Sequence, residues 1–97
     1  MSVTICYPTS GASVPGGGAV FSWGRISSDD SISGVYAQWQ SAGAAPVTVN
    51  GVPVTAPAPC DWAFEFSSVG VGPNITLTIS AVSGDYTVPF TCLGHAK

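Results

Sequence analysis

Charged residues are scarce in this chain of 97 residues: they make up 7% of it, and histidine occurs once. Five acidic residues stand against two basic ones, which gives a formal net charge of −3. Two basic side chains are too few to neutralise a run of phosphates. No basic amphipathic segment suits an anionic membrane surface, and no apolar run reaches the roughly 20 residues of a spanning helix. We therefore expect no nucleic-acid partner and no membrane insertion.

The side chains that build catalytic and zinc sites are also few. His95 lies near the C-terminus, and Glu65 on its own does not indicate a site with paired catalytic carboxylates. The sequence has no Gly-x-Ser-x-Gly nucleophile motif and no Cys-x-x-Cys pair. It therefore predicts a protein that is not an enzyme and needs no cofactor.

The N-terminal residues Met-Ser-Val-Thr-Ile-Cys lack the basic and apolar regions of a signal peptide. Two settings fit this start: a domain excised from a secreted protein, or a short gene product that joins a virus particle without Sec export. In either case we expect an extracellular, cell-surface or virion location. The length predicts one domain, residues 1–92, followed by a tail, residues 93–97.

Apolar residues are plentiful, at 45% of the chain, and they alternate with polar ones. The clearest case is residues 75–82, Ile-Thr-Leu-Thr-Ile-Ser-Ala-Val, where a period of two predicts a strand with one buried face. Similar strands are predicted at residues 3–7, 19–24, 35–40, 61–67 and 86–92, with turn signals between them. Asn50-Gly51 predicts a hairpin over residues 46–56, because this pair favours a type I′ turn.

These about seven strands predict an all-β fold, an immunoglobulin-like antiparallel β-sandwich. We expect the large aromatic side chains to supply much of its core. They are Phe21, Trp23, Trp39, Trp62, Phe64 and Phe66.

The order of several short motifs resembles that of the bacterial Ig-like domains. The motifs are Val3-Thr4-Ile5 with Pro8-x-x-Gly11, Ser33-Gly34-Val35, residues 47–54 as Val-Thr-Val-Asn-Gly-Val-Pro-Val, Trp62-x-Phe64 and residues 74–81. The last turn departs from the family, with Ser83-Gly84-Asp85 in place of an Asp-x-x-Gly-Asn sequence. The resemblance implies a non-catalytic structural or binding module on a cell surface or virus particle, such as a virion decoration protein, whose partner is a protein or a neighbouring subunit.

The outward residues of two or three strands should form a broad, uncharged sheet face. These residues are Tyr36, Gln38, Gln40, Thr76, Thr78, Ser80 and Thr87. The face is either a solvated surface or a contact with a neighbouring subunit. The rival function is an accessory carbohydrate-binding domain of a secreted bacterial protein, which needs exposed aromatic rings. Its candidates are Tyr7, Tyr36 and Tyr86.

Loop aspartates give a third hypothesis, a spacer domain stiffened by calcium. In an immunoglobulin-like topology Asp29 and Asp30 lie near Asp85 at one end of the sandwich, which Asp61 also reaches. Carboxylates are calcium ligands, but aspartates are also ordinary turn residues. Both readings stay open.

Three cysteines leave one without a partner if a disulfide forms. Cys6 and Cys92 end the first and last strands, which run parallel in such sandwiches, so we expect these two to pair. Cys60 is then free at the opposite pole. The alternative is three reduced thiols packed as small hydrophobic residues.

Overall fold

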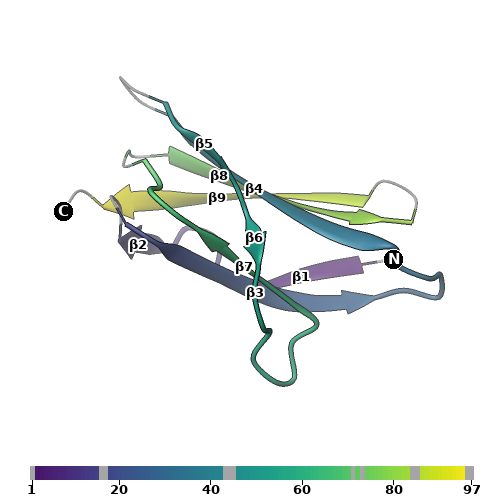
Figure 1. Cartoon of the computed structure of the whole chain (residues 1–97). Helices are drawn as coiled ribbons and strands as arrows, with labels where there is room; N and C mark the ends of the chain where they lie inside the picture. Colours follow the sequence, from purple (N-terminus) through teal and green to yellow (C-terminus); the bar gives the residue numbers. More distant parts are fainter. Residues whose placement is uncertain are drawn as a thin grey trace.

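The computed structural model has two β-sheets packed face to face (Figure 1). It describes residues 2–15, 18–42, 46–70, 72, 74–83 and 86–95, the last range through its backbone alone. Within these residues there are nine strands and no helix able to cross a membrane. The strands are β1 (Ser2–Tyr7), β2 (Ser13–Pro15), β3 (Val20–Ser27), β4 (Gly34–Ala42), β5 (Thr48–Asn50), β6 (Val52–Pro53), β7 (Trp62–Phe66), β8 (Asn74–Val82) and β9 (Tyr86–His95). The predicted all-β sandwich is therefore confirmed.

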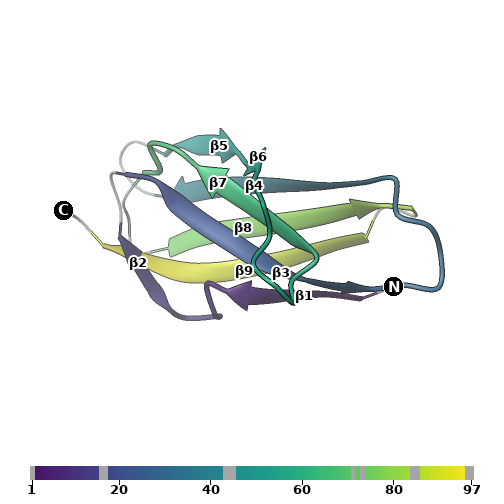
Figure 2. The same ribbon diagram turned by 60° about the horizontal axis from the view of Figure 1, so that its bottom comes forward.

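The two sheets differ in size and in strand order. One has the order β1-β3-β7-β6, and the other has the order β2-β9-β8-β4-β5. Neighbouring strands are antiparallel, except that β2 runs parallel to β9. Figure 2 shows β3 and β7 crossing over the long strands β8 and β9 of the other sheet. Strands far apart in the sequence are thus hydrogen-bonded neighbours.

Strand β8 supplies the centre of the core, as its alternation predicts. Ile75, Leu77, Ile79 and Ala81 are fully buried, whereas Thr76 between them is exposed. They pack with Trp39 of β4 and with three aromatic residues of β7, which are Trp62, Phe64 and Phe66. Trp39 lies 5.9 Å from Phe66 between ring centroids. One face of β8 is therefore wholly covered by the opposite sheet.

The predicted hairpin around Asn50-Gly51 is wrong. β5 pairs with β4 in the larger sheet, and β6 pairs with β7 in the smaller one, so the chain crosses between sheets at Gly51. The Gly51 N–H donates to the Ala37 carbonyl at 2.8 Å. A Cβ at Gly51 would lie 3.0 Å from the Phe64 Cβ and 3.1 Å from the Ala37 Cβ. Glycine is therefore needed here because the crossing is narrow.

The C-terminal tail predicted for residues 93–97 is wrong in its first three positions. Leu93, Gly94 and His95 continue β9, and they pair with the three residues of β2. The short strand β2 thus pairs with the end of β9, where the sequence predicts a tail without strand partners. His95 pairs with Pro15.

Two of the six predicted core aromatics lie on the outside. Phe21 is 46% exposed, and Trp23 is half-buried with its ring stacked on Tyr7 at a centroid distance of 4.7 Å. Val20, Ser22 and Gly24 turn inward from β3 instead. Small inward residues suit this strand because the indole of Trp62, on the neighbouring strand, lies over Gly24.

Candidate functional site

Strands β4, β5 and β8 bring eight polar side chains to the outer side of the larger sheet, and we call this surface the polar face. It consists of Tyr36, Gln38, Gln40, Thr48, Asn50, Thr76, Thr78 and Ser80. None of the eight is charged. Each is exposed or half-buried, because its neighbours along the strand point into the core. Six of these residues were predicted from the alternation of their strands.

The strand register aligns these side chains in rows across the sheet. Gln40 pairs with both Thr48 and Thr76. Gln38 pairs with both Asn50 and Thr78. Directly opposed residues on one face have Cβ atoms about 5 Å apart, so the rows make a continuous surface of amides and hydroxyls.

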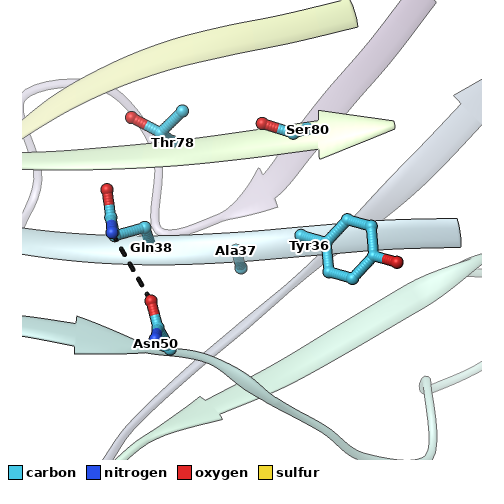
Figure 3. A pocket seen from close by; sticks show the side chains of 6 residues that line it. All are labelled: Tyr36, Ala37, Gln38, Asn50, Thr78 and Ser80. Carbon is cyan, nitrogen blue, oxygen red and sulfur yellow. Dashed lines mark hydrogen bonds between the residues drawn. The ribbon is translucent and has the colours of Figure 1, made fainter. Parts of the chain in front are cut away.

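The polar face is hollowed toward the end that carries Tyr36 and Ser80. The depression has a volume of about 220 Å³. Figure 3 shows the side chains that line it, which are Tyr36, Ala37, Gln38, Asn50, Thr78 and Ser80. The Gln38 amide donates from Nε2 to Asn50 Oδ1 at 3.4 Å, whereas Tyr36, 62% exposed, stands at the other end of the depression with its ring turned toward Gly34. The site can therefore offer both hydrogen-bond donors and acceptors, with an aromatic ring at one end.

Two residues of the polar face were missed from the sequence. Thr48 and Asn50 were expected in a hairpin with residues 52–54, but they form β5 at the edge of the larger sheet. Thr87, which was expected on the same face, pairs with Ser80 through its backbone, and its side chain lies outside the described residues.

The aspartates expected to bind calcium are only partly described. Asp29 and Asp30 lie in the loop between β3 and β4, where the Asp30 N–H donates to Ser28 Oγ at 3.0 Å. Asp85 lies outside the described residues. Asp61 accepts a hydrogen bond from the Ile26 N–H at 2.7 Å, so one of its oxygens serves the fold. In the part of the chain that is described, no three His, Cys, Asp or Glu residues gather as metal ligands.

The cysteines are arranged differently from the sequence prediction. Cys6 and Cys60 are free, half-buried thiols, and the side chain of Cys92 lies outside the described residues. The Cys6 thiol lies close enough to Cys60 to raise the pKa of the Cys60 thiol, so the expected location of Cys60 at the opposite pole is wrong. β1 belongs to the smaller sheet, and it is β2 that runs beside β9.

The smaller sheet also carries exposed apolar side chains, which form a second surface that we call the aromatic face. Phe21 and Val52 both pair with Glu65, and Trp23 pairs with Tyr7. Val52 is 60% exposed. Exposed apolar patches of this kind commonly mark contacts with other proteins.

Comparisons with known proteins identify no relative. No protein-family model, curated protein or solved structure matches this chain. The function must therefore be argued from the two surfaces themselves.

Proposed function

We propose that this chain is a non-catalytic, immunoglobulin-like module that binds a protein partner or neighbouring subunits through the polar face. The setting that we propose is a cell surface or a virus particle, where such modules pack side by side. The observation that carries the proposal is the polar face itself, eight uncharged polar residues on three strands, with five of the eight lining one depression. A surface without charge avoids the large cost of burying unpaired charges, and its amides and hydroxyls can hydrogen-bond with the partner that covers them.

The strand order supports the immunoglobulin-like part of the proposal. Immunoglobulin constant domains place strands A, B, E and D in one sheet and C, F and G in the other. Here β1, β3, β7 and β6 correspond to the first sheet, and β4, β8 and β9 to the second. Trp39, on the strand equivalent to C, is fully buried, as the tryptophan of antibody domains is. Antibody domains have a disulfide cysteine on strand B, which corresponds to β3. Here Ser22 faces the core from β3 instead, and its Oγ donates to the Tyr7 carbonyl at 2.9 Å.

The aromatic face adds support for binding of proteins rather than small molecules. It lies on the other sheet, so the two surfaces point in opposite directions. A module with two contact surfaces on opposite sides suits an array in which each copy touches neighbours on both sides.

The test measures self-association of the purified chain by light scattering over a range of concentrations. We expect a defined oligomer and at least a tenfold weaker association of the Gln38→Lys variant, because a buried lysine without a partner is costly. Ser27→Lys is the matched control. It adds the same charge at an exposed position of the smaller sheet, and we expect it to associate like the parent. Equal weakening in both variants, or a strict monomer, would remove the neighbouring-subunit version of the proposal.

The second candidate function is binding of a neutral polysaccharide. It is favoured by a depression with the exposed Tyr36 ring at one end and the Gln38 and Asn50 amides at the other, since sugars combine apolar C–H faces with hydroxyl groups. We expect such binding to slow migration of the chain in gels that contain a neutral polysaccharide. Tyr36→Ala should then lower the affinity roughly tenfold, the contribution expected of one aromatic contact. Unchanged migration of a monomeric chain on neutral polysaccharides would argue against this candidate.

A further inference from the structure

The two free thiols of the smaller sheet meet at an irregular place in β1. The register of β1 against β3 changes between Ile5, which pairs with Gly24, and Tyr7, which pairs with Trp23. Cys6 is the extra residue between them, so it sits in a β-bulge. Bulges redirect the side chains near them and are more common at sheet edges, and β1 is an edge strand.

Cys60 arrives at the same place from the loop between β6 and β7. Its N–H donates to the Pro57 carbonyl at 2.7 Å, which closes a turn. The next residue, Asp61, donates from its N–H to the Gly24 carbonyl at 2.8 Å and accepts from the Ile26 N–H at 2.7 Å. These hydrogen bonds attach the loop to β3, the strand that separates β1 from β7. Figure 2 shows the loop reaching across β3 toward β1.

The two thiols lie near each other. Cys6 is within interaction range of Cys60, and both are half-buried, so an oxidant in solution can still reach them. Burial raises the pKa of the Cys60 thiol, the nearby Cys6 thiol adds to the rise, and the Arg25 guanidinium opposes it. Neither thiol is used by the polar face, which lies on the other sheet.

We propose that Cys6 and Cys60 form a disulfide under oxidising conditions, and that it fastens the edge strand β1 to the loop leading into β7. With glutathione disulfide as oxidant, one cysteine thiolate attacks its S–S bond, forms a mixed disulfide and releases one glutathione. The second cysteine thiolate attacks the mixed disulfide and releases the other glutathione. The protein loses two protons and two electrons, and one glutathione disulfide becomes two glutathione molecules.

The link would matter most for β1. This strand has a single neighbour in its sheet, β3, whereas the disulfide connects it to a segment on the far side of β3. More than half of the chain lies between the two cysteines. Joining residues so distant in sequence removes much of the freedom of the unfolded chain, and a rise of roughly 10 °C or more in melting temperature is expected.

The experiment incubates the folded chain with glutathione disulfide, blocks the remaining thiols with iodoacetamide and cleaves before aspartate. Cleavage before Asp29, Asp30, Asp61 and Asp85 leaves each cysteine in a different peptide. The expected product joins peptide 1–28 to peptide 30–60, with a mass two hydrogens below the sum of the two. A product that joins 1–28 to 85–97, or full alkylation of Cys6 and Cys60, would overturn the proposal.

Two variants separate this disulfide from incidental oxidation. Cys92→Ser keeps both thiols of the proposed pair, so it should form the link and show the rise in melting temperature. Cys6→Ser combined with Cys92→Ser leaves Cys60 alone, and its melting temperature should not rise on oxidation. If Cys92→Ser forms the link only when unfolded in urea, the folded geometry does not support the disulfide and the proposal fails.

Discussion

Replacing Gly24 with alanine tests how tightly β3 is enclosed by its neighbours. Gly24 turns inward from β3, and a Cβ at this position would overlap the Thr4 carbonyl oxygen and approach the Trp62 Cε2 atom to 2.8 Å. The carbonyl belongs to the backbone of β1, in a ladder where Thr4 pairs with Arg25. The indole is buried and 5% exposed, so it has little room to move. The methyl group therefore forces β1 away from β3 and displaces the Trp62 ring in the core.

The expected loss follows from both consequences. Overpacking of a core costs about 1–3 kcal/mol. Weakening of one or two ladder hydrogen bonds adds about 1 kcal/mol. We expect Gly24→Ala to lose about 3 kcal/mol, a large part of the 5–15 kcal/mol typical of a domain. With a urea m-value of about 1.5 kcal/mol/M, the unfolding midpoint should fall by about 2 M.

The measurement is urea unfolding followed by tryptophan fluorescence, with Gly18→Ala as the matched control. A Cβ at Gly18 has no atom within 4 Å, so that variant should stay within about 0.5 kcal/mol of the parent. If Gly24→Ala unfolded within the same range as Gly18→Ala, the close approach of β1 and Trp62 to β3 would be refuted.

Two further predictions concern a buried hydroxyl and a thiol. Ser41→Ala should lower stability by about 1–2 kcal/mol in the same urea assay. Ser41 Oγ is buried and accepts from the Val47 N–H at 3.0 Å, and in the variant this N–H would lose its partner. An unchanged stability would contradict this hydrogen bond. The raised pKa of Cys60 predicts that its alkylation by iodoacetamide, followed on peptide 30–60, reaches half its maximal rate above pH 9.0, and that Cys6→Ser lowers this midpoint. Because the unfolded chain forms the thiolate more readily, this group should also make stability fall as the pH rises from 9.0 toward the pKa in the folded protein. A midpoint at or below pH 9.0 would contradict the burial of Cys60 beside Cys6.

The regular strands of this fold were predictable because alternation reports burial directly. β8 has one face against the opposite sheet and one outside, so its apolar and polar residues separate cleanly. The same holds for β4, where Tyr36 and Gln38 face outward and Trp39 faces inward. The polar face follows from these two strands. Its existence could therefore be read from the sequence, whereas its depression depends on β5.

Alternation leaves open which of two faces is buried when both carry plausible residues. In β3, Phe21 and Trp23 share one face, and Ser22 and Gly24 share the other. The larger residues suggest the core, but the small ones occupy it because Trp62 fills the space above Gly24. The choice is set by the size of side chains on a neighbouring strand, which the sequence of β3 alone does not contain.

Turn chemistry is similarly local. Asn50-Gly51 satisfies the requirements of a tight hairpin, yet the chain passes from one sheet to the other at this point. Glycine serves both purposes, because a turn needs its backbone freedom and a crossing needs its missing side chain. Only the pairing of β5 with β4 and of β6 with β7 distinguishes them, and those pairings depend on residues far away in the sequence.

The thiol pair shows why irregular positions are the hardest to predict and the most informative to test. Cys6 reaches Cys60 because β1 has a bulge and because Asp61 binds two backbone groups of β3. Neither feature has a period, and the pairing of Cys6 with the last strand was expected only from the order of strands in an immunoglobulin-like sandwich. The polar face depends on the regular parts of β4, β5 and β8, on the other sheet. A variant that removes Cys6 should therefore abolish the proposed disulfide and leave binding at the polar face unchanged, which makes the two proposals separately testable in the same protein.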